Sequence, residues 1–398
     1  MRKQLVLVGG GHAHMMVLEN ISQFITKKVK VTVIGPSSYH YYSGMGPGML
    51  GGTYRPEDIR FATQKVVQHQ GGVFIKDSVV KIDPVTRQVL TLSGHSFAYD
   101  LISFNSGSYV PIHAVNSEST NIAPVNLGPT NTEPSNPESN NKYHNNIYPV
   151  KPIEKLMEAA EQLKLLFKQK KIHVSIVGGG PSSAEIAGNV WQLAKKTKGH
   201  LPDITIYSGH KFMARFSDNI RSRMIRALIK KGIQINETGY VKTIKTDEIT
   251  LESGQVFSTD FIFMASGVKP STIFEASGLP TGPDKGLLVN SYLQSVKYPQ
   301  IFGGGDCIYF EKQPLDKVGV YAVRQNPILL HNLLASIDGH DLKEFKPGPE
   351  YLLIFNAGGG IGVLKKKGLV FGGRPAFWIK DYIDRKFMKK FQAIEKGL

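Results

Sequence analysis

The chain has 398 residues, of which 41% are apolar and 20% charged, and 48 lysines and arginines stand against 32 acidic residues, a net charge of +16. This predicts a globular protein of two or three domains with an anionic partner such as a nucleotide or an anionic lipid. The single cysteine, Cys307, excludes an intrachain disulfide, a redox-active cysteine pair and a multi-thiolate zinc site. No apolar segment is long enough to span a membrane and no signal peptide is evident, which predicts a reducing, cytoplasmic location.

A strand, a glycine loop and a helix open the chain, and the same pattern recurs near its middle. The first unit has an apolar strand at residues 4–8 followed by GGGHAH, and the second has an apolar strand at residues 172–177 followed by GGGPSSAE. Such loops present unpaired backbone N–H groups at a helix N-terminus, where a pyrophosphate binds. Two copies therefore predict two dinucleotide-binding units, although both lack the third glycine and the acidic residue expected at the ribose.

Three further motifs follow in a fixed order: FNSGS at residues 104–108, FMASGVKP at 263–270 and IFGGGDC at 301–307. With the two glycine loops, this order resembles two-dinucleotide-binding flavoproteins of the pyridine nucleotide-disulfide oxidoreductase superfamily, type II NADH dehydrogenases in particular. The segments GGGHAH, YSGMGPGMLGG, VKPIE and IKDYIDRKFM are similar to the oxidoreductase module fused to some selenide, water dikinases. The resemblance implies an α/β fold with two Rossmann-like domains and a smaller C-terminal α+β region.

The resemblance also implies domain boundaries. Residues 1–113 and 265–330 would bind FAD, residues 149–264 would bind NAD(P)H, and residues 331–398 would form a C-terminal interface or membrane-docking region. Residues 114–148 are rich in Asn, Ser, Thr and Pro and carry almost no apolar pattern, so they cannot build a core. They are interpreted as a low-complexity insertion that is either disordered or a lid near the cofactors.

The implied activity is that of an FAD-dependent NAD(P)H dehydrogenase, which transfers hydride from nicotinamide to flavin and electrons on to a quinone without a redox-active disulfide. Four residues carry implied roles: Asp306 at the ribityl chain, Pro47 against the isoalloxazine ring, Glu185 toward the nicotinamide, and Gln325 at the quinone-side signature. The structural alternatives are a turn residue for Asp306, a turn without a cofactor role for Pro47 and a surface-helix residue for Glu185. The other residues implied at the cofactors are Gly9, Gly10, Gly11, His12, Ala13, Ser37, Ser38, Ser106, Gly107, Gly178, Gly180, Pro181, Ser182, Ser208, Lys211, Gly267, Gly305 and Ala322.

The choice of electron donor is left open by the second unit. In place of an acid, the end of its second strand offers Ser208, His210, Lys211 and then Arg215. A hydroxyl and cations suit the 2′-phosphate of NADPH, whereas an acid would repel it. We expect a preference for NADPH over NADH, with solvated surface charge as the alternative.

His12, His14 and His40 invite comparison with a metal site. His12 and His14 are two residues apart and therefore do not share a helix face. We predict that no metal is bound, and that these side chains serve packing or the phosphate side of a cofactor.

The C-terminal segment from Lys365 to Leu398 carries ten basic and three acidic residues. Five apolar residues fall on or near one helical face, and the basic residues lie largely elsewhere, which is the pattern of a helix at an anionic membrane surface. The alternative is a helix packed on the FAD domain or on the second subunit of a homodimer. The apolar set is Phe377, Ile379, Ile383, Phe387 and Phe391, and the basic set is Lys380, Arg385, Lys386, Lys389 and Lys390.

Two other functions stay open beside a quinone reductase. The quinone-side signature carries Tyr321 where its first glutamine is expected, which favours a flavin reductase of a soluble acceptor, such as a selenium or sulfur compound or a protein. The missing ribose acids favour a non-catalytic nucleotide-binding protein. No basic and aromatic cluster of a known nucleic-acid module is found outside the C-terminal segment, so we predict no nucleic-acid partner.

Overall fold

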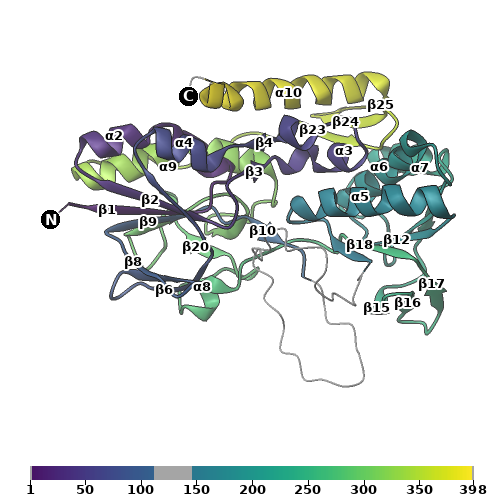
Figure 1. Cartoon of the computed structure of the whole chain (residues 1–398), viewed down its shortest axis with the longest axis horizontal. Coiled ribbons are helices and arrows are strands. Elements are labelled where there is room, and N and C mark those ends of the chain that lie inside the picture. Colours follow the sequence, from purple (N-terminus) through teal and green to yellow (C-terminus); the bar gives the residue numbers. More distant parts are fainter. Residues whose placement is uncertain (1, 112–145, 397–398) are drawn as a thin grey trace.

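The computed structural model describes residues 2–111 and 146–396, so most of the predicted insertion lies outside the described residues. Two halves lie side by side along the long axis, with the N-terminus at one end (Figure 1). Each half is built on a five-stranded sheet whose neighbouring strands are all parallel. The predicted α/β class with two Rossmann-like units is confirmed.

The first sheet has the strand order β21-β9-β1-β2-β5. Its central strands are nearly continuous apolar runs, as expected for a parallel sheet covered on both faces. In Figure 1, helices lie above this sheet, and an antiparallel sheet of β6, β7 and β8 lies below it with α8. The strands of the parallel sheet are β1 (Gln4–Val8), β2 (Lys30–Gly35), β5 (Val73–Lys76), β9 (Leu101–Phe104) and β21 (Ile301–Gly303).

The second sheet repeats this plan in the order β11-β18-β12-β13-β14, again with helices above and the antiparallel sheet β15-β16-β17 below (Figure 1). The edge strand β11 includes Ile147 and Tyr148, which sequence analysis places at the end of the insertion. The second sheet therefore begins two residues before the predicted start at 149. Its strands are β11 (Ile147–Pro149), β12 (His173–Val177), β13 (Asp203–Tyr207), β14 (Gln234–Asn236) and β18 (Phe261–Met264).

The helices follow the two halves in chain order. The sequence after Pro152 predicts a helix from about Ile153 to Lys168, and this helix is observed as α5, one residue later at each end. The sequence also predicts that a helix begins near Lys317. It is observed as α9, which begins two residues later and runs through the predicted domain boundary at 330. The helices are α1 (Met15–Glu19), α2 (Ile21–Thr26), α3 (Gly46–Leu50), α4 (Thr63–His69), α5 (Glu154–Gln169), α6 (Pro181–Thr197), α7 (Asp218–Ile229), α8 (Ile273–Ala276), α9 (Gly319–Asp338) and α10 (Arg374–Lys396).

The remaining strands complete the two halves and join them. The small sheets are antiparallel except for the pair β20 and β22. The pair β10 and β19 connects the segments that follow β9 and β18. The strands are β3 (His40–Tyr41), β4 (Arg60–Phe61), β6 (Val79–Asp83), β7 (Gln88–Thr91), β8 (Ser96–Ala98), β10 (Ser108–Tyr109), β15 (Val241–Ile244), β16 (Glu248–Leu251), β17 (Val256–Ser258), β19 (Lys269–Pro270), β20 (Leu287–Val289) and β22 (Ile308–Phe310).

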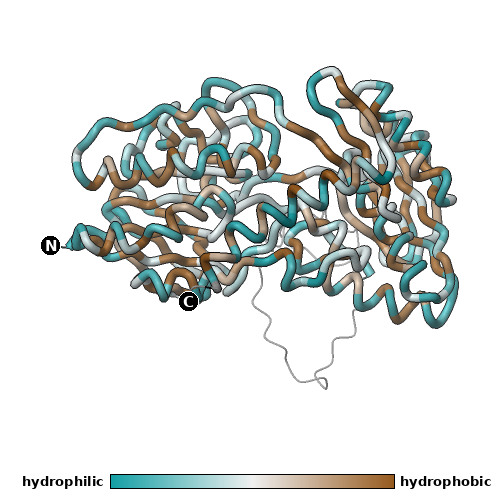
Figure 2. Tube along the Cα trace, turned by 90° about the horizontal axis from the view of Figure 1, so that it is seen from above, coloured by the Kyte–Doolittle hydropathy of each residue, from teal (hydrophilic) through white to brown (hydrophobic). Residues whose placement is uncertain are grey.

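The C-terminal region bridges the two halves. Strands β23 (Leu353–Asn356), β24 (Gly362–Lys366) and β25 (Leu369–Gly373) form an antiparallel sheet beside α6 and α7 of the second half. From there α10 runs back across the top of the molecule and reaches β4 and α4 of the first half (Figure 1). Apolar residues concentrate along the interior strands of each half and polar residues along the outer turns (Figure 2), and the buried residues fall into two core clusters.

Candidate functional site

The first glycine loop is held by the side chain of Asn105. The amide oxygen of Asn105 accepts a hydrogen bond from Ala13 N at 3.0 Å, and its amide nitrogen donates to Gly304 O at 2.7 Å. Gly9 has φ of +86°, and a Cβ there would lie 2.4 Å from Asn105 O. A Cβ on Gly11 would lie 2.2 Å from the amide oxygen of Asn105. Only glycine fits at these two positions, so the loop backbone stays open to a ligand.

The other predicted contacts of this loop lie around its rim. A Cβ on Gly10 would lie 2.5 Å from Thr63 Cγ2 at the start of α4. Ser37 and Ser38 follow β2 and are half-buried. Ser38 donates to Gln64 Oε1 at 2.6 Å, so one of the two hydroxyls predicted at the adenosine ribose already has an acceptor. The ribose role of Ser37 and Ser38 stays a prediction.

Gln325 links the GGD motif to α9. Its side-chain oxygen accepts a hydrogen bond from Gly305 N at 2.7 Å, and Ala322 lies beside the same glycine. The side chain of Gln325 is fully buried, yet its Nε2 has no partner among the described residues. A buried donor without an acceptor carries an energetic cost, which a bound ligand would relieve. The backbone of the first glycine loop and the unpartnered Nε2 of Gln325 fit an FAD molecule at the carboxyl edge of the first sheet.

Asp306 pairs with Lys151, a residue of the VKPIE motif. Lys151 Nζ lies 2.8 Å from Asp306 Oδ2, and Ser108 donates to the same oxygen at 2.9 Å. Burial opposes ionisation of Asp306, but Lys151 and Ser108 together hold its pKa below the ordinary value. Asp306 is therefore an ionised acceptor at this edge. Its serine partner is Ser108, whereas Ser106 of the same motif is exposed.

The histidines are buried and neutral. Burial lowers the pKa of both His12 and His14 to about 4. His14 Nδ1 lies 2.7 Å from Gly9 O and therefore donates to it, while Nε2 lies 2.8 Å from Ser103 Oγ. His12 Nδ1 lies 3.1 Å from His40 Nε2, and its own Nε2 is buried without a partner among the described residues. His14 thus has a structural role, whereas His12 presents a free ring nitrogen beside the first loop.

The second glycine loop is more open than the first. A Cβ on Gly178 would lie 2.2 Å from Ala265 O, and one on Gly179 would lie 2.5 Å from Ser208 O. In contrast, a Cβ on Gly180 would meet nothing within 4 Å. The helix α6 begins with Pro181 directly after Gly180. Ser182 is exposed, so the N-terminus of α6 is accessible to a ligand.

The residues predicted to select the donor lie in different environments. Ser208 is buried and donates to Asn236 O at 3.0 Å, so its hydroxyl is already engaged. Lys211 is exposed and lies 3.8 Å from Asp218, a weak pair. Arg221 binds Glu237 at 2.7 Å, and Glu237 also accepts from Phe212 N, which fixes the loop. The cations of this loop thus remain free to contact a ligand, while Ser208 serves the fold.

Gly107 and Gly267 occupy corresponding places in the two halves. Gly107 follows β9 and Gly267 follows β18, and a Cβ on either would meet nothing within 4 Å. Gly107 directly precedes β10, and Gly267 lies two residues before β19, its partner strand. They therefore lie where the chain crosses between the two halves.

Glu185 lies on α6 where the second half meets the C-terminal region. Its Oε1 accepts a hydrogen bond from Asn356 N at 2.7 Å. Burial raises the pKa of Glu185 to about 7; Lys380 and the Asn356 N–H oppose this rise, and Asp384 adds to it. Glu185 is therefore not an ordinary surface residue of a helix, and its pKa lies near neutral pH. Its place toward the nicotinamide stays a prediction.

A buried ion pair on α10 lies next to this carboxyl group. Lys380 Nζ lies 2.5 Å from Asp384 Oδ2 and also donates to Gly44 O at 2.8 Å, while Tyr42 donates to the other oxygen of Asp384 at 3.3 Å. Both charged side chains are less than 10% exposed. The expectation that Lys380 belongs to the outward basic set is wrong, because this residue is needed to pair Asp384 inside the protein.

Pro47 is buried in α3, which packs against α5 and α6. The packing is close: a Cβ on Gly46 would lie 2.8 Å from Ile153 Cδ1, and one on Gly48 would lie 2.5 Å from Tyr54 Cε2. Pro47 therefore lies at the junction of the halves. Its contact with the isoalloxazine ring stays a prediction.

The C-terminal helix has two apolar faces where sequence analysis predicts one. Phe387 and Phe391 pack inward, with Phe387 stacked on His12 at 5.6 Å between ring centroids and Phe391 6.0 Å from Phe61. The other face is exposed, and its large residues are Trp378, Ile379, Tyr382 and Ile383, at 63%, 38%, 66% and 40% exposure. Among the helices that the structure describes, none combines the length and apolar character needed to cross a bilayer.

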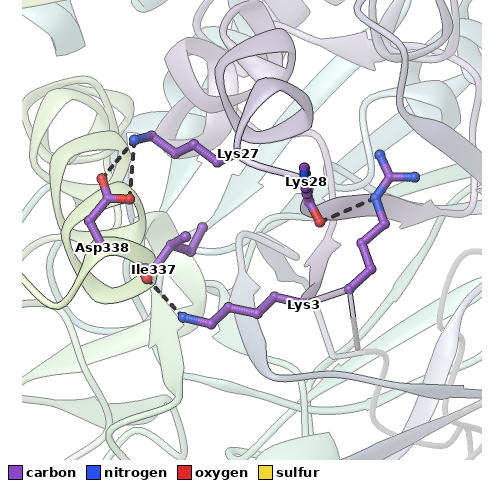
Figure 3. Close-up of a pocket in the computed structure, with 6 residues that line it drawn as sticks. Lys3, Lys27, Lys28, Ile337 and Asp338 are labelled. Atoms are coloured by element: carbon purple, nitrogen blue, oxygen red, sulfur yellow. Dashed lines mark hydrogen bonds and ion pairs between the residues drawn. The ribbon is translucent and has the colours of Figure 1, made fainter.

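A hollow of about 840 Å³ lies at the outer end of the first half, where Lys3 and Lys27 converge on the end of α9 (Figure 3). Lys27 pairs with Asp338 at 2.9 Å and Lys3 donates to Ile337 O at 2.8 Å. These cations lie at the C-terminal end of α9, where the helix dipole attracts positive charge.

Within residues 2–111 and 146–396, no three His, Cys, Asp or Glu side chains cluster as a metal site would require.

Sequence reasoning missed three residues of the site: Asn105, Lys151 and Lys380. Asn105 and Lys151 belong to the motifs FNSGS and VKPIE, but neither motif reveals that its polar side chain reaches Gly304 or Asp306, about 200 and 155 positions away in the chain. The i, i+4 spacing of Lys380 and Asp384 was visible. Their burial was not, because it depends on how α10 docks.

Comparison with known proteins agrees with this architecture. Residues 3–326 match the family model described as pyridine nucleotide-disulphide oxidoreductase. The type II NADH:quinone oxidoreductase of Staphylococcus saprophyticus is 24% identical, over 99% of this chain and 97% of that protein.

Two solved structures share the fold. The NDH2 of Plasmodium falciparum, solved with NADH, has a TM-score of 0.75 at 15% identity, over 99% of this chain and 97% of that one. The sulfide:quinone oxidoreductase of Aquifex aeolicus has a TM-score of 0.73 at 18% identity, over 98% and 92%. The chain belongs to the pyridine nucleotide-disulphide oxidoreductase family.

Proposed function

We propose that this protein is an FAD-dependent NAD(P)H:quinone oxidoreductase. The observation that carries the proposal is Glu185, a carboxyl group with a pKa of about 7 placed between α6 of the second half and the buried Lys380–Asp384 pair of α10. Reduction of a quinone to a quinol consumes two protons with two electrons, so the site needs a group that gives up protons near neutral pH. The names of the staphylococcal and Plasmodium relatives support the same reading.

The chain's own residues bind and orient the reactants. Gly9, Gly11 and Asn105 would hold the FAD diphosphate, and Asp306 would lie at the ribityl chain. When bound, FAD would supply the hydride acceptor and the electron carrier, which no side chain of this protein can provide. Glu185 holds a proton on the carboxylate oxygen that Asn356 N does not contact, and Lys380 keeps a positive charge nearby.

The test is the pH dependence of quinone reduction. The raised pKa of Glu185 means that its proton is present below about pH 7 and lost above it. We expect the rate with a water-soluble quinone to fall about tenfold per pH unit above pH 7, and Glu185→Gln to lower the rate at pH 6 about a hundredfold and to flatten the profile. Reduction of ferricyanide, which takes no protons, serves as the control and should change little. A Glu185→Gln variant with the wild-type profile would contradict this role.

We further propose NADPH as the preferred donor. The support is the exposed Lys211 and Arg215 beyond β13 and the lack of an acid at the end of this strand. A 2′-phosphate would bind these cations, whereas a carboxylate in the same place would repel it.

The exposed face of α10 is proposed to dock on an anionic membrane as a peripheral attachment on the cytoplasmic side. Aromatic and aliphatic side chains lie between basic residues on this face, as in helices that bind at the lipid interface. Docking there would bring a lipid-soluble quinone to the helix whose inward face carries Asp384, the partner of Tyr42, and Lys380, whose charge acts on Glu185. The same apolar face is the place where a second subunit would bind if the protein forms a homodimer.

A further inference from the structure

A second hollow lies where α6 meets the start of α10. This Trp191 groove has a volume of about 390 Å³ and is lined by Trp191, Lys195, Lys196, Gly359, Gly360 and Phe377, among others. Trp191 and Phe377 are half-buried, and a Cβ on Gly359 would lie 3.2 Å from the Trp191 ring. The groove therefore has an apolar floor with lysines on its rim. It is separate from both glycine loops, since it lies three turns along α6 from Gly180.

Three lysines surround Trp191 without a carboxylate partner. Lys195 Nζ and Lys231 Nζ lie 5.7 and 5.5 Å from the centroid of the Trp191 ring. Lys196 donates to Gly52 O at 2.6 Å and Lys231 to Ala227 O at 2.9 Å, so their hydrogen-bond acceptors are neutral carbonyls. No ion pair involves any of the three within the described part of the chain.

Lys195 and Lys196 are exposed and Lys231 is half-buried, and none of the three has a carboxylate as a counter-charge among the described residues. Lys151, Lys317 and Lys380 are at least as well covered, and each pairs with an aspartate at 2.5–2.8 Å. At Lys196 and Lys231, burial lowers the pKa. A partly desolvated ammonium without an anion is destabilised, and a bound anion would remove that cost.

We propose that the Trp191 groove binds one molecule of an anionic phospholipid, with its phosphate among Lys195, Lys196 and Lys231 and an acyl chain along Trp191 and Phe377. Charge complementarity requires an anion, and the apolar lining favours an anion that carries a hydrocarbon chain. Phe377, which lines the groove, directly precedes Trp378 and Ile379 of the exposed face of α10. The inference rests on the proposed docking of that face.

The two tryptophans of the chain, Trp191 and Trp378, allow a direct test, because they report separately on the groove and on the docking face. The FAD-loaded variants Trp378→Phe and Trp191→Phe each keep one tryptophan. Each is mixed with vesicles of equal parts phosphatidylcholine and phosphatidylglycerol, with bromine on the acyl chains of one lipid or of the other. Both vesicle types have the same charge, so the protein docks equally on both. They differ only in which of the two lipids carries the bromine that quenches tryptophan fluorescence.

We expect Trp191 to be quenched about three times more strongly when phosphatidylglycerol carries the bromine, and Trp378 to be quenched equally by both vesicles. The pair Lys195→Gln and Lys231→Gln should equalise the quenching of Trp191. The matched pair Lys30→Gln and Lys346→Gln, exposed on the first half, should leave the difference in place.

Four outcomes would overturn the inference. Equal quenching of Trp191 by both lipids would show that the groove does not select an anionic lipid. A Trp191 emission change of the same size with inorganic phosphate alone would show that the groove does not require the acyl chain. Quenching of Trp378 without quenching of Trp191 would refute the groove and leave docking intact. If neither tryptophan is quenched, docking and the groove fail together, and reduction of a soluble quinone then still tests the proposed enzyme independently.

Discussion

The two glycine loops follow the same backbone plan but differ in one side chain. In the first half, the residue after β9 is Asn105, whose side chain ties the loop to Gly304; in the second half the residue after β18 is Ala265, which has no side chain to do this. Gly11 therefore packs against Asn105, whereas Gly180 faces open space. A clamped loop suits a cofactor that stays bound through many turnovers, and an open loop suits a donor that must leave after each one.

The comparison predicts its largest difference at Gly11 and Gly180. A Cβ at position 11 would overlap the Asn105 amide, so Gly11→Ala should purify without FAD and lose about 3 kcal/mol of stability. Gly180→Ala, whose Cβ meets nothing, should keep a full complement of FAD and an unchanged melting temperature. The flavin-to-protein absorbance ratio and thermal unfolding measure both effects. Equal loss of FAD in the two variants would show that the loops are equivalent.

Asn105→Ala gives the first loop the residue found in the second. It removes two buried hydrogen bonds, which should cost about 2–4 kcal/mol and make FAD dissociate at least tenfold faster. The measurement is the rate at which flavin fluorescence appears on dilution. Ser22→Ala, at an exposed position of α2 in the same half, is the control and should behave as the wild type. An Asn105→Ala protein that retains FAD as tightly as the wild type would mean that the clamp is not what distinguishes the loops.

The smallest effect is expected at the open loop. Lys211→Ala should raise KM for NADPH about fivefold, because an exposed charge contact contributes about 1 kcal/mol, and should leave KM for NADH and FAD content unchanged. Lys242→Ala, another exposed lysine of the second half, serves as the matched control. A uniform rise in KM for both donors would indicate a role in folding of the loop, and unchanged KM values would refute the proposed contact with the 2′-phosphate.

The sequence allowed much of the fold to be predicted, because the repeated strand, loop and helix pattern is local and periodic. The parallel sheets follow from it, and α5 and α9 begin within about two residues of their expected starts. The C-terminal helix was harder. Phe387 and Ile383 lie one turn apart and look alike in the sequence, but one packs on His12 and the other is exposed.

Contacts over long sequence distances account for what could not be predicted at the site. The Asn105 clamp, the Lys151–Asp306 pair and the contact of Glu185 with Asn356 each join residues more than 90 positions apart. No local periodicity carries this information. The glycine motifs predicted the two strand, loop and helix units, but the charges that surround the loops follow from tertiary packing.

The central claim is that one bound flavin accepts electrons from a nicotinamide at the open loop and gives them to a quinone. The most direct measurement is an anaerobic titration of the purified protein with NADH and with NADPH, followed by addition of a soluble quinone, while the visible flavin band is recorded. The account predicts bleaching by one equivalent of donor, faster with NADPH, and full return of the band with one equivalent of quinone. A flavin that neither nucleotide bleaches, or that the quinone does not reoxidise, would contradict it.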